Sequence, residues 1–75
     1  HLTKTEEREA RAERVLRIAL ADQRINQRDL ARKMNRKYCT VNKRINEPGT
    51  CTLYELWDFL DELNVPPEER AKLLY

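Results

Sequence analysis

The sequence predicts an all-α fold, a compact bundle of about five short helices. Apolar residues recur three and four positions apart along most of the chain, and no segment alternates apolar and polar residues as a half-buried strand would. Strong helix breakers are confined to Pro48–Gly49 and Pro66–Pro67, which separate the later helices. Residues 1–75 suffice for one small domain with a thin core. Because the chain opens on His1 rather than Met, we also allow for a longer protein with a further domain.

The first helix is predicted from about Thr5 to Asp22. Thr5 can serve as the N-cap, the glutamates after it suit a first turn, and no glycine or proline interrupts the segment. Glu13 and Arg17 are four residues apart in the order that favours an ion pair, as are Glu7 and Arg11. The apolar stripe consists of Ala12, Val15, Leu16, Ala19 and Leu20. We expect a charged amphipathic helix that packs one face on the core.

Two shorter helices are predicted next, with a tight turn between them. Asn26 can cap the second helix, and Asp29 occupies the partner position of a capping box. This helix is expected to end at Asn35, a residue type that tolerates left-handed backbone. The third helix is predicted from about Lys37 to Asn46. The inward-facing residues of the pair are Leu30, Ala31, Met34, Val41 and Ile45.

The remaining chain predicts two more helices. Thr52 is a candidate N-cap for a helix that runs through Leu63. Its predicted apolar stripe is Leu53, Leu56, Trp57, Leu60 and Leu63, which places Trp57 in the core. Pro66 and Pro67 suit the start of a last helix, PEERAKLLY, over residues 67–75.

The formal net charge of +2 conceals a polarised distribution. Basic and acidic residues balance as far as Gln23, whereas Arg24–Asn46 holds eight basic residues against Asp29 alone. From Glu47 onward seven acids face Arg70 and Lys72. A basic segment in a nearly neutral protein indicates a polyanionic partner on one face. Charge alone leaves a merely solvated surface equally open.

The sequence lacks the residues that several functional classes of protein require. His1 is the only histidine, so neither a Ser-His-Asp nor a Cys-His catalytic set exists, and Cys39 and Cys51 are too few ligands for a zinc site. Gly49 is the only glycine, which excludes a glycine-rich phosphate loop. No apolar run approaches the roughly 20 residues that span a bilayer. We therefore expect no enzyme, cofactor, metal or small-molecule substrate, no membrane partner, and reduced thiols in a cytoplasm.

The chain from about Arg24 to Leu63 resembles the Cro and phage-repressor family of helix-turn-helix transcription regulators. The resemblance rests on Gln27, Leu30–Ala31, Met34, Val41, the segment TLYELWDFLDELNV and the ending PPEERAKLL. The chain departs from the family pattern at three positions. Asn35 replaces the usual turn glycine, Arg36 stands where a small or apolar residue is common, and Arg44 takes a position that is usually apolar.

The resemblance implies a lambda-repressor-like fold and sequence-specific binding of double-stranded DNA, with the helix at 37–46 in the major groove. The expected base-reading residues are Lys37, Tyr38, Cys39, Asn42 and Lys43. The expected phosphate-binding residues are Asn26, Gln27, Arg28, Arg32, Arg36, Thr40 and Asn46. The implied role is that of a transcriptional repressor in the cytoplasm of a bacterial or phage-infected cell.

Two questions about partners stay open at this point. Leu73, Leu74 and Tyr75 could support a homodimer on DNA, or they could fold back on the first helix. The alternative function is a protein-interaction module on the same fold, such as an antitoxin or a regulatory subunit, which would use the fourth helix and the acidic C-terminal part.

Overall fold

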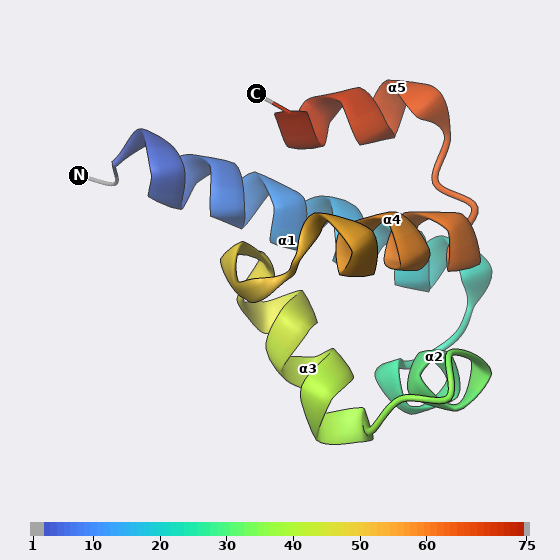
Figure 1. Cartoon of the computed structure of the whole chain (residues 1–75). Coiled ribbons are helices and arrows are strands. Elements are labelled where there is room, and N and C mark those ends of the chain that lie inside the picture. The colour runs from blue at the N-terminus through green and yellow to red at the C-terminus, as the bar shows by residue number, and fades with distance from the viewer. Residues whose placement is uncertain (1–2, 75) are drawn as a thin grey trace.

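The computed structural model describes residues 3–74, and every regular element in that range is helical (Figure 1). The α-helices are α1 (Lys4–Gln23), α2 (Gln27–Lys33), α3 (Tyr38–Asn46), α4 (Leu53–Glu62) and α5 (Pro67–Ala71). Two short 3-10 helices complete the chain, η1 (Pro48–Thr50) and η2 (Lys72–Leu74). The prediction of an all-α bundle of five helices is confirmed.

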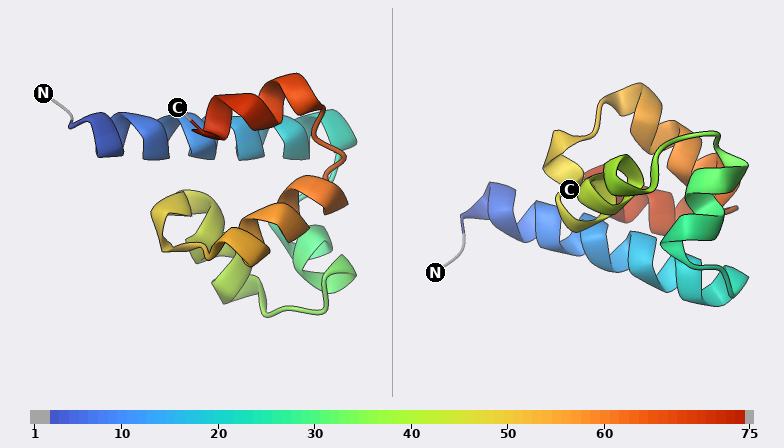
Figure 2. Two further views of the ribbon diagram at one scale, coloured as in Figure 1. Left: turned by 45° about the horizontal axis from the view of Figure 1, so that its top comes forward. Right: turned by 90° about the horizontal axis from the view of Figure 1, so that it is seen from below.

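The longest helix, α1, spans the bundle, and the other helices pack around it. In Figure 2 (left), α5 runs alongside α1 while α4 lies below them. The α2–α3 pair occupies the end of the molecule opposite α5 in Figure 1. Gly49 in η1 donates its backbone N–H to Glu9 Oε2 at 2.8 Å, which ties the segment after α3 to the first half of α1.

The core of the described residues is formed by twelve buried apolar residues from α1, α2, α3, α4 and the segment that follows α4. They are Val15, Leu16, Ala19, Leu20, Leu30, Ala31, Val41, Ile45, Phe59, Leu60, Leu63 and Val65. The buried residues of α1, α2 and α3 all belong to the stripes predicted for those helices. Spacing along a helix was therefore sufficient to assign the inner faces of the first three helices.

The predicted N-cap of α1 was wrong by two residues. Thr3, rather than Thr5, caps the helix: its hydroxyl accepts from Glu6 N at 3.1 Å, while Glu6 Oε1 accepts from Thr3 N at 3.3 Å. A threonine followed three positions later by a glutamate is the capping-box pattern, and Thr5 has no such partner. The predicted Glu13–Arg17 pair is present at 3.8 Å.

The placement of Trp57 in the core was also wrong. Phe59, which the predicted stripe omitted, is buried together with Leu60, whereas Trp57 and Leu53 are about half exposed. Two overlapping stripes on α4 satisfy helical spacing, and the one through Leu56, Phe59 and Leu60 faces the core. The second stripe is left on the surface as an apolar face.

A residue in the left-handed backbone conformation follows three of the helices, α1, α2 and α4. Asn35 has φ 56°, as predicted for the turn after α2, and Arg24 and Asn64 share this left-handed conformation. After α2, Asn35 N donates to Arg32 O and Arg36 N donates to Ala31 O at 2.9 Å, the bonding pattern of a Schellman motif. This turn redirects the chain into α3.

The C-terminal residues follow the fold-back alternative as far as they are described. Leu73 packs against the core, and η2 lies against α1. Tyr75 and the side chain of Leu74, on which the homodimer expectation also rested, lie outside the described residues.

Candidate nucleic-acid interface

The α2–α3 pair turns a polar edge of α3 outward. Leu30 and Ala31 of α2 and Val41 and Ile45 of α3 are buried in one cluster, which fixes the inner side of the pair. Cys39 and Lys43 stand two positions on either side of Val41, and both are exposed. Two positions on a helix correspond to about 200° of rotation, so these side chains lie on the side of α3 away from the core.

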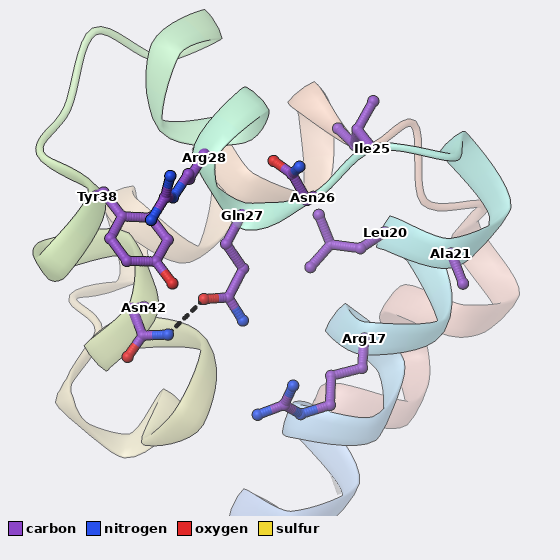
Figure 3. A pocket seen from close by; sticks show the side chains of 9 residues that line it. All are labelled: Arg17, Leu20, Ala21, Ile25, Asn26, Gln27, Arg28, Tyr38 and Asn42. Carbon is purple, nitrogen blue, oxygen red and sulfur yellow. Dashed lines mark hydrogen bonds between the residues drawn. The ribbon is translucent and has the colours of Figure 1, made fainter.

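Tyr38 lies at the edge of α3 that borders α2. The guanidinium carbon of Arg28 lies 5.2 Å from the centre of the Tyr38 ring, within the range of a cation–π contact (Figure 3). The ring itself is exposed. Arg28 therefore contacts the Tyr38 ring, and Tyr38 remains 44% exposed.

A chain of side-chain hydrogen bonds connects α1, α3 and α2. Arg17 Nη2 donates to Asn46 Oδ1, Asn46 Nδ2 donates to Asn42 Oδ1 at 3.1 Å, and Asn42 Nδ2 donates to Gln27 Oε1 at 2.6 Å. Figure 3 shows the last of these bonds, with Gln27 and Asn42 turned toward one another. The two polar atoms of the Asn42 amide are thus both engaged inside the protein.

An open hollow of about 540 Å³ lies beside this chain of hydrogen bonds, between α1, the start of α2 and α3 (Figure 3). Arg17 and Arg28 line it together with the polar side chains of Gln27 and Asn42. Asn26 also borders the hollow, and its Oδ1 accepts from Asp29 N at 2.8 Å, so it caps α2 as predicted. Only the Asn26 half of the predicted capping box is present.

Two of the eight basic residues between Arg24 and Asn46 are engaged by α4. Arg44 Nε lies 3.2 Å from Glu55 Oε2, and Arg36 lies 3.6 Å from the same carboxylate and 3.2 Å from Asp58. The side chain of Glu55 is only 14% exposed. The backbone N–H of Thr52 and the Arg44 guanidinium hold the pKa of Glu55 below its ordinary value. Arg44 is thus ion-paired with an acid on the next helix.

The other six basic residues of this segment form no ion pair within residues 3–74. They are Arg24, Arg28, Arg32, Lys33, Lys37 and Lys43, and all are exposed. An exposed cation without an ion-pair partner is available to an external anion. This surface is therefore basic, although it carries six cations without an ion-pair partner rather than the eight counted in the sequence.

The expected site residues fall into groups in the structure. The fold gathers Asn26, Gln27, Arg28, Tyr38 and Asn42 around the hollow. Lys37, Cys39 and Lys43 are exposed on or before α3, Arg32 is exposed on α2, and Thr40 is half-buried. Arg36 is separated from the rest by its pairing with Glu55 and Asp58. Asn46 joins the group through Arg17, which sequence reasoning missed because nothing in the spacing of α1 relates it to α3.

The two cysteines are both free thiols in different surroundings. Cys39 is exposed on α3, whereas Cys51 is half-buried and its Sγ lies 3.7 Å from Arg44 O. Burial, assisted by the negative charge of Glu55, raises the pKa of Cys51 to about 11. Chemical modification should therefore distinguish the two.

Comparisons with protein-family models, with curated protein sequences and with solved structures find no match to this chain. Over residues 3–74, no three histidine, cysteine, aspartate or glutamate side chains are grouped so that they could hold a metal ion. None of the helices in that range combines the length and the apolar character needed to cross a bilayer.

Proposed function

We propose that this chain binds double-stranded DNA as a Cro-type helix-turn-helix repressor and reads its target with α3 in the major groove. The observation that carries the proposal is the outward edge of α3, where Tyr38, Cys39 and Lys43 are exposed beside a group of unpaired cations. Such an edge contributes nothing to the core. It has the polarity that base edges and phosphates require.

The size of α3 suits this role. Its nine residues form a helix of about 10–12 Å diameter with side chains, and the major groove of B-DNA is about 12 Å wide. In the groove, Lys43 can donate to guanine O6 and N7, while Tyr38 can present its hydroxyl or ring edge to a base. Arg28, Arg32 and Lys37 are placed to neutralise phosphates on the flanking backbone. Arg36 has a smaller part, because Glu55 and Asp58 already neutralise it.

The hydrogen-bond chain from Arg17 to Gln27 supports a preorganised reading helix. It joins α3 to α1 and α2 through side chains rather than through the core alone. A helix held on two sides loses less freedom when DNA binds, which favours affinity. We assign Asn42 to this positioning role rather than to base contact, because both polar atoms of its amide are engaged within the protein.

Selection from random duplexes, followed by titration of a selected and a scrambled duplex across a salt series, tests the proposal. We expect the selected duplex to bind at least about a hundredfold more tightly. Six phosphate contacts would give a slope of about −5 in a plot of log K against log salt concentration. Equal affinity for both duplexes would contradict sequence-specific reading.

The proposal includes two copies on a near-palindromic site. One α3 offers few base contacts, and half-sites one helical turn apart, about 34–36 Å, would double them. Stoichiometry measured on the selected site checks this part. One protein per duplex with a single protected half-turn would contradict it and leave DNA binding itself intact.

A further inference from the structure

Arg36 lies in the turn between α2 and α3, two residues before the first residue of α3. Its backbone is held in place, because Arg36 N donates to Ala31 O at 2.9 Å in the Schellman motif that ends α2. Its guanidinium contacts two carboxylates of α4. The adjacent Lys37, by contrast, is exposed and has no ion pair within residues 3–74. Two neighbouring cations at the start of α3 therefore differ in their availability to an external anion.

Asp58 is the acid that holds Arg36 most closely. Arg36 Nη2 donates to Asp58 Oδ2 at 3.2 Å. The contact of Arg36 Nη1 with Glu55 Oε2 is longer, at 3.6 Å, which is beyond hydrogen-bond distance. The same oxygen of Glu55 accepts from Arg44 Nε at 3.2 Å, so its charge is shared between two guanidinium groups. The position of the Arg36 side chain therefore depends mainly on Asp58.

The Arg44 guanidinium is held more firmly. Besides its bond to Glu55, it donates from Nη1 to Thr50 O at 2.8 Å. Glu55 is only 14% exposed and caps α4 together with Thr52. Arg44 is thus built into the junction between α3 and α4.

The Arg36–Asp58 pair, by comparison, is open to solvent. The side chain of Asp58 is 58% exposed and that of Arg36 33%. Ion pairs between such groups are weak, because water solvates both charges when they separate. A phosphate accepts hydrogen bonds from a guanidinium in the same geometry as a carboxylate does. An external phosphate can therefore compete with Asp58 for Arg36.

We propose that Asp58 is an autoinhibitory residue: it withholds Arg36 from the anionic groups of an external polyanion. The inference rests on the proposed function, under which these groups are the phosphates of DNA beside α3. Separating Arg36 from Asp58 would add one cation to the six that have no ion-pair partner on this surface. The free energy needed to separate the pair is subtracted from the gain of the new phosphate contact, so the contact with Asp58 limits affinity.

The contact limits affinity without changing sequence preference. A guanidinium that binds phosphate contributes to every duplex alike, because phosphates carry no base identity. Withholding Arg36 therefore weakens binding to the selected and the scrambled duplex by the same factor. One phosphate contact also changes the slope of log K against log salt concentration by about 0.9. These two effects distinguish the loss of a phosphate contact from the loss of a base contact.

Asp58→Ala tests the proposal. Position 58 is exposed within α4, and alanine is a better helix former than aspartate, so the variant should fold. We expect it to bind both duplexes at least about threefold more tightly than the parent, with a salt slope steeper by about 0.9. Asp58→Asn, which removes the charge and keeps the shape of the side chain, should change both quantities in the same direction. Thermal melting of each variant checks that it folds.

Asp61→Ala is the matched control. Asp61 is exposed on the same helix, three residues after Asp58, but it pairs with Arg70 of α5 at 2.9 Å. Its removal subtracts the same charge, and Arg70 keeps its bonds to Val65 O and Leu60 O. No cation is released beside α3, and salt screens the remaining change in charge. We expect the affinity of Asp61→Ala to stay within about twofold of that of the parent.

A double-mutant cycle shows whether the gain passes through Arg36. In an Arg36→Ala chain, Asp58 has no guanidinium to withhold, so adding Asp58→Ala should change affinity less than about twofold. An equal gain with and without Arg36 would overturn the proposal, because Asp58 would then act only by repelling DNA. An unchanged affinity and salt slope for Asp58→Ala, on a duplex that the parent binds, would also overturn it.

Retention on heparin separates this inference from the proposed function. Heparin is a polyanion without bases, so it reports the released cation whether or not the chain binds DNA. We expect Asp58→Ala to elute at higher salt than Asp61→Ala, and this difference should disappear when Arg36→Ala is added to both. Such elution by a chain that binds no duplex would refute the proposed function alone. Equal elution of the two single variants would refute the withholding of Arg36.

Discussion

Asn42 on α3 donates its side-chain amide to Gln27 on the first turn of α2, with 2.6 Å between Nδ2 and Oε1. Asn42 also accepts from Asn46, whose own Oδ1 accepts from Arg17. The two helices are therefore linked at their polar edge as well as through their buried residues. This relationship makes Asn42 a positioning residue for α3 in the proposed function.

Replacing Asn42 by Ala should weaken binding to the selected and the scrambled duplex by similar factors. The reason is that the variant loosens α3 without removing a base-specific contact. Gln27→Ala should have a similar effect, and the double variant should lose less than the sum of the two, because both changes break the same bond. Fluorescence anisotropy titrations of the parent, the two single variants and the double variant on both duplexes provide this double-mutant cycle. A loss confined to the selected duplex would show that Asn42 reads a base.

Lys43→Ala should behave differently from Asn42→Ala. Lys43 is exposed on the outer side of α3, so its loss should cost about 1–3 kcal/mol on the selected site and flatten the preference at one base position. Arg32 on α2 is the matched control, because it too is exposed and has no ion pair within residues 3–74. Arg32→Ala should weaken all duplexes alike and reduce the salt slope by about one. If Lys43→Ala also weakens both duplexes equally, Lys43 contacts a phosphate.

The turn between α2 and α3 can be tested at Asn35. Its φ of 56° is accessible to glycine without strain, so Asn35→Gly should keep the melting temperature close to that of the parent. Asn35→Val should lower it clearly, because a β-branched residue resists left-handed backbone at a cost of about 1–3 kcal/mol. Circular dichroism melts of the three proteins measure this. Identical melting temperatures for all three would contradict a left-handed residue at position 35.

Glu55 should link stability to pH. Because folding lowers its pKa from the ordinary 4.5, its contribution is fully present above that value and is lost as the pH falls through the lowered pKa. Thr52 caps α4 as predicted, in a capping box in which Glu55 Oε1 accepts from Thr52 N at 3.0 Å and Thr52 Oγ1 accepts from Glu55 N at 3.1 Å. Glu55→Gln keeps an oxygen for this capping box but removes the charge next to Arg44, so it should cost about 1–2 kcal/mol at pH 7. The cost should shrink as the pH falls below about 4.5. Urea unfolding at several pH values provides the measurement, and a pH-independent difference between the two proteins would contradict the ion pair.

The cysteines should report on the proposed DNA interface. Burial raises the pKa of Cys51 to about 11, so its half-buried thiol is almost entirely protonated at pH 8. Cys39 is exposed, so alkylation should modify Cys39 first, and Cys39→Ser should leave only the slow reaction. A selected duplex should protect Cys39 and leave the rate at Cys51 unchanged. Unaltered alkylation of Cys39 in the presence of saturating duplex would argue against α3 as the reading element.

The local features of the fold were predictable from the sequence. The stripes of α1, α2 and α3, the caps at Asn26 and Thr52 and the left-handed Asn35 depend on residues within one or two turns of each other, and these are the distances at which helical periodicity and capping operate. The exposed side of α3 followed from the same reasoning, since Val41 and Ile45 fixed its inner face, except at Asn42, which was expected to read a base but is half-buried and bonded to Gln27 and Asn46. The error at Thr5 was also local. The capping-box pattern of Thr3 and Glu6 could have been recognised in the sequence.

Only the tertiary structure decided which contacts form between segments distant in sequence. On α4, Phe59 and Trp57 both satisfy helical spacing. The shape of the core formed by the other helices decides between them, and it accommodates Phe59. The pairing of Arg36 and Arg44 with Glu55, and the bonds that join Arg17, Asn46, Asn42 and Gln27, each require helices to be positioned side by side. The sequence alone identified the polar residues on the outer side of α3. The packing of α1, α2 and α4 around this helix decided which of those side chains are bonded within the protein and which remain exposed.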